Sequence, residues 1–389
     1  YRNAFFQCHD PLYLYFTNIE EKILDTISLI QTLTIIAGIA SIAYLYVLKV
    51  VIESKRLPII HKGVAEGVSI VIAAHNELEN LKVHLESFLN QSYPDFEVIV
   101  VCDRCTDGSV EYLQRINNKK LIIKEITELY PDINSKKRAV TEGITCASKP
   151  WILLTDADCF VDNSGWILSM MEAKEQKDIC IGVSMYEQKS TILNQIIQFE
   201  TVITALQYVS WAILGKPYMA VGRNLLYSKQ LFINNHGFGN RAQHLGGDDD
   251  LLIQQIATSR NSTVGINSQT ITRSKPTEGF RAWWRQKHRH LHAGKSYPIT
   301  VVICLSIYPV FGLLYYLGCI YCLFTHDIKA IMLFYILRTC IFISIFVRMR
   351  RKLDVAIHTL YLPIAEIVYL MYLLFAGIYN LAVPIKKWK

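Results

Sequence analysis

The chain has 389 residues, of which 51% are hydrophobic and 19% are charged, and its formal net charge is +7. This balance is too apolar for an ordinary soluble protein, and the excess lies at the two ends of the chain. The mixed segment between the ends, about 230 residues long, is enough for one substantial domain. The composition therefore excludes a wholly soluble protein and predicts a membrane protein that carries one soluble domain.

The first apolar stretch covers residues 27–52 and is long enough to span a bilayer. Basic side chains follow it at Lys55, Arg56 and Lys62. By the positive-inside rule, these side chains place the next domain in the cytoplasm. We therefore expect an integral protein of the cell (inner) membrane whose soluble domain is cytoplasmic.

Three more apolar stretches follow the soluble domain, which predicts a C-terminal membrane region of two to four segments. The expected layout is an N-terminal segment at 1–26, a transmembrane helix at 27–52, a soluble domain at 64–297, a membrane region at 298–383 and a basic tail at 384–389. The soluble domain is thus expected to have membrane segments on both sides.

Strand and helix patterns alternate in the first half of the soluble domain. The strand patterns cover 68–73, 96–102, 121–126 and an apolar run within Trp151–Asp158 that stops on two carboxylates, and the helix patterns cover 77–90, 110–116 and 135–147. Short apolar runs of this kind are typical of strands buried on both faces. Their alternation with helices implies an α/β fold with a doubly wound, mostly parallel sheet.

The second half of the domain is less regular. We expect strands at 180–188 and 218–227, the second kinked at Gly222, and helices at 191–214 and 251–258. The helix at 191–214 is mostly apolar, and a further helix near 277–293 is basic and carries Trp283 and Trp284. Both helices are expected to lie at the membrane interface, which aromatic and basic side chains favour.

Seven Lys or Arg residues lie within positions 273–295, opposed only by Glu278. Such a segment suits phosphates or anionic lipid heads. Nucleic acid is the weaker interpretation, because the two tryptophans of this segment favour a membrane interface. We therefore expect a phosphate-bearing or membrane partner and no nucleic acid.

Asp156 and Asp158 end the fourth predicted strand. Open α/β sheets bind ligands in the crevice beyond the carboxyl ends of their strands. Two carboxylates spaced in this way can hold a divalent cation, which in turn can hold a diphosphate. The alternative is a simple turn, in which Asp is favoured for its own hydrogen bonds.

Asp248, Asp249 and Asp250 precede another predicted helix. A helix dipole favours acids at this end, so a helix cap is one interpretation of the three residues. A catalytic cluster is the other, and the local pattern leaves both open.

These features stand in the order typical of a known family. Residues 68–77 (V-S-I-V-I-A-A-H-N-E) resemble its opening strand and turn, and residues 100–109 (V-V-C-D-R-C-T-D-G-S) resemble its D-D-x-S-x-D-x-T segment. Further matches are residues 135–139 for G-K-x-x-A, 156–158 for the metal and nucleotide-sugar motif, 247–249 for G-D-D or T-E-D, and 286–290 for Q-x-x-R-W. The chain is thus similar to membrane-integrated family 2 glycosyltransferases with a GT-A fold, of the type of the ceramide-glucoside, hyaluronan and cellulose synthases.

The resemblance implies roles for individual residues. It implies that Asp249 is the general base of an inverting sugar transfer, and that Asp158 binds Mg²⁺ or Mn²⁺. The implied nucleotide-sugar-binding residues are Ala73, His75, Glu77, Asp103, Lys136, Asp156, Gln286 and Arg289. The implied acceptor-side residues are Arg223, Asp248, Trp283 and His290.

The sequence also departs from the family pattern. His290 stands where the Q-x-x-R-W motif has Trp, and Cys102 and Ser135 replace the usual Asp and Gly. Together with the small number of membrane segments, these departures favour a single transfer over processive synthesis.

Three functions are therefore compared. The leading hypothesis is an enzyme that moves a sugar from a nucleotide-diphosphate sugar, with UDP as the expected nucleotide, to a membrane-associated acceptor such as a lipid at the cytoplasmic leaflet. The alternative is a processive β-polysaccharide synthase with a glycan acceptor. A non-catalytic nucleotide-binding membrane scaffold is disfavoured because the expected metal and base acids are all present.

Overall fold

The computed structural model describes residues 11–55, 66–130, 132–244, 247–324, 328–355 and 357–382. These residues belong to two units. The larger unit comprises Val47–Val302 and Phe346–Lys389, and the smaller unit comprises Tyr1–Tyr46 and Ile303–Ile345. The predicted tail at 384–389 lies outside the described residues.

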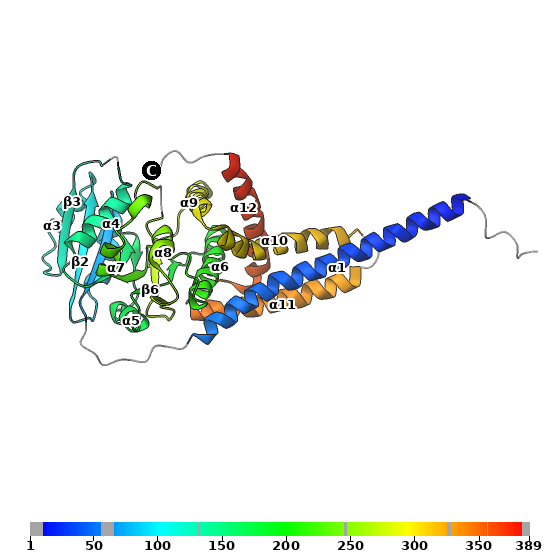
Figure 1. Ribbon diagram of the computed structural model, residues 1–389, viewed down its shortest axis with the longest axis horizontal. Coiled ribbons are helices and arrows are strands. Elements are labelled where there is room, and N and C mark those ends of the chain that lie inside the picture. Colours follow the sequence, from blue (N-terminus) through cyan, green and yellow to red (C-terminus); the bar gives the residue numbers. More distant parts are fainter. Residues whose placement is uncertain are drawn as a thin grey trace, which may run out of the picture. The chain divides into compact units, whose positions relative to one another are not determined.

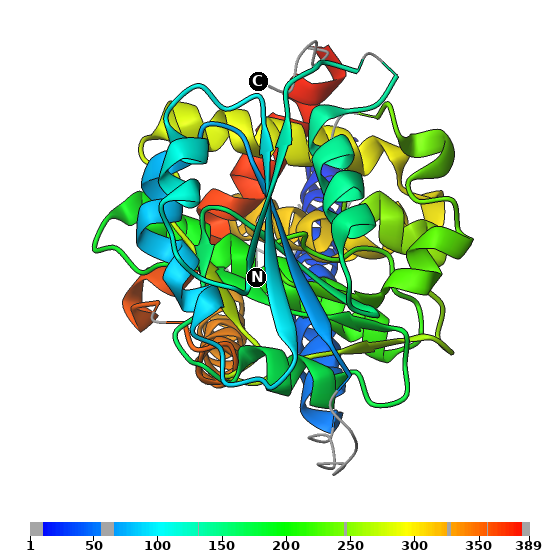
Figure 2. The same ribbon diagram turned by 90° about the vertical axis from the view of Figure 1, so that its left-hand side faces the viewer.

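A seven-stranded sheet in the order β3-β2-β1-β4-β8-β6-β9 forms the centre of the larger unit (Figure 2). Its strands are β1 (Val68–Ala74), β2 (Phe96–Asp103), β3 (Leu121–Ile126), β4 (Trp151–Asp156), β6 (Ile179–Ile181), β8 (Leu225–Ser228) and β9 (Ser262–Val264). The first four are mutually parallel, whereas β8 runs antiparallel to both of its neighbours. The prediction of an α/β fold with a mostly parallel sheet is therefore confirmed.

Helices cover the parallel strands on both sides (Figures 1 and 2). They are α2 (Leu78–Leu89), α3 (Ser109–Gln114), α4 (Ser135–Cys146) and α5 (Trp166–Ala173). Every residue of β2 is buried, as expected for a parallel strand with helices on both faces. Leu81, Leu85 and Phe88 of α2 join this core. Because these four strands are parallel, the loops that join their carboxyl ends to the helices lie together at one edge of the sheet.

The predicted strand at 180–188 is wrong in one respect, because it forms two strands in different sheets. β6 lies in the large sheet, and β7 (Ser184–Tyr186) joins a three-stranded sheet with β5 (Cys159–Phe160) and β10 (Thr272–Ser274). The chain changes sheets at Gly182, where a Cβ atom would collide with the side-chain amide of Asn224. Only glycine allows that close approach.

The predicted strand at 218–227 is also wrong over most of its length, since only its end forms β8. The preceding residues turn, and Asn224 donates its backbone N–H to Val221 O. The buried side-chain amide of Asn224 donates to the carbonyls of Val183 and Thr270 at 2.7 and 2.6 Å and accepts from Trp166 Nε1 at 3.2 Å. These bonds fix the turn between the two sheets.

Beyond the sheets, the larger unit contains further helices. They are α6 (Ile192–Ile213), α7 (Lys229–Asn234), α8 (Asp250–Ile256), α9 (Phe280–Ala293) and α12 (Leu362–Ala382). The predicted helix at 191–214 is confirmed as α6. Its polar side chains are engaged within the protein, since Gln198 donates to Tyr186 O at 2.7 Å and Ser210 donates to Leu48 O at 2.9 Å. The placement of this helix at a membrane interface stays a prediction.

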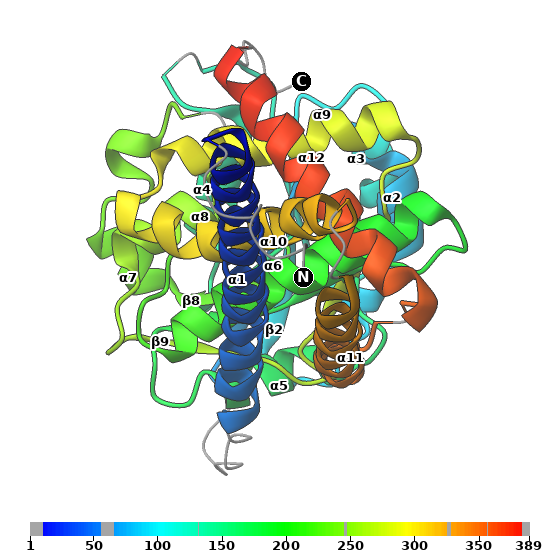
Figure 3. The same ribbon diagram turned by 90° about the vertical axis from the view of Figure 1, so that its right-hand side faces the viewer.

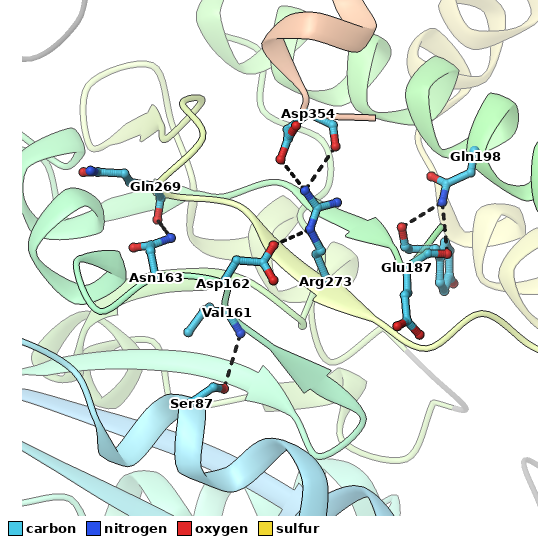
Figure 4. A network of polar contacts seen from close by, with 10 residues as sticks. Ser87, Val161, Asp162, Asn163, Glu187, Gln198, Gln269, Arg273 and Asp354 are labelled. Carbon is cyan, nitrogen blue, oxygen red and sulfur yellow. Dashed lines mark hydrogen bonds and ion pairs between the residues drawn. The ribbon is translucent and has the colours of Figure 1, made fainter. Parts of the chain in front are cut away.

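Arg273 of β10 joins three parts of the larger unit (Figure 4). Its guanidinium pairs with Asp162, just after β5, and with Asp354, in the loop before α12. The neighbouring residue, Ser274, is bonded to Arg223 on the other side of the strand. β10 therefore connects the loop before α12, which contains Asp354, with the residues just after β5, which include Asp162.

The smaller unit consists of the parts of α1 (Pro11–Ser54), α10 (Ile299–Cys322) and α11 (Ile328–Lys352) that fall within its bounds. These helices lie side by side (Figures 1 and 3). Gly38 and Gly318 allow close packing, since a Cβ atom there would collide with Phe334 and Thr34 respectively. Arg338 is buried, donates to Ser41 Oγ at 3.1 Å and lies 4.8 Å from the ring centroid of Tyr315.

Five helices in the described part of the chain are long and apolar enough to cross a membrane. They are Asp25–Ser54, Ile192–Ile213, Ile299–Cys322, Lys329–Lys352 and Thr359–Asn380. Four correspond to the apolar stretches predicted from the sequence, and the fifth is α6. The exact domain layout and the side of the membrane stay predictions.

We predict that Asn224→Leu lowers the unfolding temperature of the detergent-solubilised protein by at least ~5 °C. The substitution leaves two carbonyls and an indole N–H buried without partners, which costs about 3 kcal/mol or more. Thermal unfolding followed by intrinsic fluorescence measures the effect. Asn240→Leu, at an exposed position, is the matched control. Equal stability of the two variants would contradict this assignment of Asn224.

Candidate active site

The ends of β1, β2 and β4 bring several predicted residues together. Ala73 lies opposite Asp156 in the sheet register. His75 Nδ1 lies 2.6 Å from the carbonyl oxygen of Asp103. Glu77 is close enough to Asp158 to affect its ionisation. Six of the predicted nucleotide-sugar or metal residues therefore share one edge of the sheet.

Asp103 is held by its neighbour. Both of its carboxylate oxygens accept hydrogen bonds from Arg104 at 2.8 Å, and Arg104 also donates to Ser135 Oγ at 2.9 Å. Arg104 has a positive φ of 50°, which turns its side chain back onto Asp103. The bidentate pair orients Asp103 and connects the end of β2 with the start of α4.

Lys136 joins the two groups of acids in the site. Its ammonium lies 2.9 Å from Asp156 Oδ1 and 2.9 Å from Asp248 Oδ2. Burial alone would lower the pKa of Lys136, but the carboxylates of Asp156, Asp248 and Asp249 outweigh burial and hold it well above its usual value. Lys136 is therefore a permanent positive charge between the end of β4 and the loop before α8.

Asp158 is half-buried near a second cation, Arg223. Burial and the nearby Asp156 raise the pKa of Asp158 to about 6, whereas Arg223 acts in the opposite direction. The Arg223 guanidinium donates to Ser274 Oγ at 2.6 Å and lies 4.6 Å from the ring centroid of Tyr186. The structure thus places Arg223, which was predicted on the acceptor side, next to the two carboxylates that end β4.

The carboxylate oxygens at the end of β4 fit a divalent cation. Asp158 offers a hard carboxylate oxygen, and the raised pKa of this crowded carboxyl shows that added positive charge would be favourable there. Among the described residues, no three His, Cys, Asp or Glu side chains converge as a complete metal site. A cation bound by Asp158 would therefore take its remaining ligands from a bound molecule such as a diphosphate.

Asp249 is held on both carboxylate oxygens by backbone donors. Oδ2 accepts from Gly222 N at 2.7 Å, and Oδ1 accepts from Asp250 N at 2.7 Å. Burial, together with Asp248 and Asp250, raises the pKa of Asp249 to about 8. An oriented carboxyl group that titrates near neutral pH is suited to take up a proton.

Gln286 of α9 reaches the site through Tyr186. Its side-chain amide donates to Tyr186 Oη at 3.2 Å, and the Tyr186 ring stacks with Arg223. Trp283, in contrast, is 2% exposed and packs 4.9 Å from the Tyr372 ring, so its surroundings are the aromatic side chains of α9 and α12. The side chains of Arg289 and His290 lie outside the described part of the structure.

Sequence reasoning missed Lys137, Tyr186 and Tyr297. Lys137 is fully buried, and its ammonium donates to the carbonyl oxygens of Arg241 and His244, just before the three acids. Its position directly after Lys136 was the only signal in the sequence. Tyr186 and Tyr297 carry no local motif, because they reach the site from segments distant in sequence.

The comparisons with known proteins agree with this geometry. Residues 69–243 match the family described as Glycosyl transferase family 2. The fold is that of a mannosyltransferase from Pyrobaculum calidifontis, solved in complex with GDP-Man and Mn²⁺, with a TM-score of 0.56, 17% identity, and coverage of 89% of this chain and 99% of that one. The segment at 69–243 is therefore similar to family 2 glycosyltransferases, and the chain has a GT-A-like core with long apolar helices at both ends.

Two relatives indicate which kind of glycosyltransferase the chain resembles. The chain is 25% identical to the poly-beta-1,6-N-acetyl-D-glucosamine synthase of Staphylococcus epidermidis over 201 residues, which cover 50% of this chain but only 45% of that enzyme. It is 23% identical to the synthase of the same name from Staphylococcus aureus (strain COL) over 307 residues, which cover 72% of this chain and 71% of that enzyme. The chain is thus similar to enzymes that make a polysaccharide. Its assignment to the specific ceramide-glucoside, hyaluronan or cellulose synthase type stays a prediction.

We predict that Asp158→Asn abolishes turnover and weakens nucleotide-sugar binding only when Mg²⁺ or Mn²⁺ is present, because an amide is a poorer ligand for a hard cation. Binding titrations with and without a chelator measure this difference. Asp162→Asn, four residues further along and exposed, is the matched control. Full activity of Asp158→Asn in the presence of chelator would show that the assignment is wrong.

We predict that kcat/KM rises about tenfold per pH unit below pH 8 and levels off above it. Asp249 must lose its proton before it can accept one, and its pKa in the free enzyme is raised to about 8. Asp249→Asn should remove this dependence and lower turnover by at least ~10²-fold with donor binding retained. If Asp248→Asn or Asp250→Asn causes that loss while Asp249→Asn stays active, the base is a neighbour.

Proposed function

We propose that this chain is a membrane polysaccharide synthase that transfers a sugar, N-acetylglucosamine being the first candidate, from a nucleotide-diphosphate donor to a hydroxyl of a growing glycan. The observation that carries the proposal is the Lys136 bridge, which joins the acids at the end of β4 to the acids before α8. The proposed donor-binding acids and the proposed base, Asp249, would thereby belong to one site. The relatives that make poly-beta-1,6-N-acetyl-D-glucosamine support the glycan as acceptor.

The donor would bind at the carboxyl ends of β1, β2 and β4. Ala73, His75, Glu77 and Asp103 line this edge and would contact the nucleoside. Asp156 and Asp158 would contact the ribose and, through Mg²⁺ or Mn²⁺, the diphosphate. The cation supplies charge stabilisation to the leaving diphosphate when it is bound.

Two fixed cations of the chain would share that task. Lys136 and Arg223 both lie among the acids and keep their charge at neutral pH. As the bond between the anomeric carbon and the diphosphate oxygen breaks, negative charge moves onto the leaving group, where donors of this kind stabilise it. Gln286, which is joined to Arg223 through Tyr186, would add an amide donor, and Arg289 of the same helix is proposed for the same role.

Asp249 would act on the other side of the sugar. It would take the proton from the acceptor hydroxyl, whose oxygen forms the new bond to the anomeric carbon from the face opposite the diphosphate. One bond forms as one breaks, so the configuration inverts. Asp248, held by Lys136, would fix the loop beside the acceptor.

The acceptor is the point on which the sequence and the comparisons differ. The helices expected at the membrane interface favoured a lipid acceptor and the sequence departures favoured a single transfer, whereas the relatives favour a glycan. The proposal follows the relatives, because it does not require Trp at position 290: Trp283, Trp284 and His288 already lie near Tyr372 and Tyr379 between α9 and α12. The proposed cell-membrane location and cytoplasmic donor site are unchanged.

Product length tests the proposal. The full chain, purified in detergent and supplied with Mn²⁺ and radiolabelled UDP-N-acetylglucosamine, should produce a ladder of polymers that a β-1,6-specific hydrolase digests. UDP-glucose and GDP-mannose serve as competing donors, and Asp249→Asn is the inactive control. A labelled lipid carrying one sugar would instead support the lipid acceptor, and a polymer from another donor would change the sugar.

A further inference from the structure

Tyr297 lies at a junction between two helices and the base. It follows α9 and a short 3₁₀ helix, Gly294–Ser296, and it precedes α10 by one proline. Its hydroxyl donates to Asp250 Oδ2 at 2.7 Å, and its ring packs edge-on against Tyr218 at a centroid distance of 5.9 Å. No motif of the family includes this position.

A continuous set of hydrogen bonds leads from Tyr297 to Asp249. Asp250 accepts from Tyr297 through Oδ2 and from Leu251 N through Oδ1 at 2.7 Å. The backbone N–H of Asp250 in turn donates to Asp249 Oδ1. The side chain and the backbone of Asp250 are therefore fixed together, and the backbone orients the proposed base.

The charge of Asp250 also depends on its hydrogen bond from Tyr297. The ionisable groups that face Asp249 and Asp250 are Asp248, Lys136, Lys137, Tyr218 and Tyr297. Burial raises the pKa of Asp250, whereas its bond from Tyr297 acts in the opposite direction and favours the charged carboxylate over the protonated form. A charged Asp250 repels negative charge on Asp249 and makes Asp249 a stronger base.

We propose that Tyr297 is a positioning residue for the general base: through its hydroxyl it holds Asp250 charged and in place, and so sets the orientation and the basicity of Asp249. The proposal rests on the proposed function of Asp249. It makes the segment between the Gln286 helix and α10 part of the catalytic apparatus, although Tyr297 itself touches no reacting atom.

Tyr297→Phe tests the proposal because it removes only the hydroxyl and keeps the ring against Tyr218. Without its donor, Asp250 takes up a proton more readily, repulsion on Asp249 falls, and the acid limb of the kcat/KM profile should move about 1 unit to lower pH. The plateau should fall roughly tenfold because the base is weaker and less well oriented. Binding of UDP with Mn²⁺ should not change, since the hydroxyl lies on the base side of the site.

Tyr93→Phe is the matched control. Tyr93 is buried, and its hydroxyl donates an equally short bond of 2.7 Å to Glu66 O, beside the opposite ends of the strands. If Tyr297 were only structural, both variants would lose thermal stability and neither would shift the pH profile. An unshifted acid limb in Tyr297→Phe would overturn the proposal.

A double-mutant cycle covers the case in which Tyr297→Phe folds poorly. Asp250→Asn removes the charge through which Tyr297 acts, so it should shift the acid limb in the same direction by itself. Adding Tyr297→Phe to Asp250→Asn should then shift the limb no further. Additive shifts, or no shift in Asp250→Asn, would contradict the mechanism.

Asp249→Asn separates the two proposals. If Asp249→Asn stays active, the assignment of Asp249 as the base has failed. If Asp249→Asn is inactive and Tyr297→Phe leaves the pH profile unshifted, only the role of Tyr297 is rejected.

Discussion

The site depends on one half-buried lysine between two carboxylates. Lys136 begins α4, Asp156 ends β4, and Asp248 belongs to a loop almost one hundred residues further along the chain. Without the lysine, the acids at these places would repel one another in a poorly solvated crevice, and the cost of burying them would have no compensation. The pair of contacts is therefore both the electrostatic condition for assembling the site and the physical link between its donor side and its base side.

The surrounding structure strengthens that link from several directions. Lys137 holds the carbonyls of the loop before the acids, Gly222 allows the backbone to approach Asp249, and Tyr297 anchors Asp250. On the donor side, Ser274 and Tyr186 hold Arg223 beside Asp158. The two sides differ in electrostatics as well, because acids and fixed cations lie together at the end of β4, whereas burial, together with Asp248 and Asp250, raises the pKa of Asp249 to about 8. This division matches the needs of sugar transfer, in which one side stabilises a leaving diphosphate and the other accepts a proton.

Local patterns were enough to predict the parallel half of the sheet. The strands from Val68, Phe96, Leu121 and Trp151 are short apolar runs whose bounds follow directly from turn residues. The same reasoning failed at 180–188 and 218–227, because the amide of Asn224 packs on Gly182 and imposes a change of sheet that no local periodicity reveals. Candidate site residues within motifs, such as Lys136 and Asp249, could be proposed from the sequence. Tyr186 and Tyr297 could not, since their roles arise only from long-range contacts. The position of Arg223 was likewise set by its contacts with Tyr186 and Ser274.

A structure of the full chain with UDP and Mn²⁺ would test the central claim most directly. The account predicts the nucleotide at the carboxyl ends of β1, β2 and β4, with the cation on Asp158 and the ammonium of Lys136 moved from Asp156 toward a phosphate oxygen. Asp249 should remain bonded to Gly222 and face the open side of the diphosphate. A nucleotide bound elsewhere, or Lys136 still held between Asp156 and Asp248 with the diphosphate out of its reach, would contradict the account.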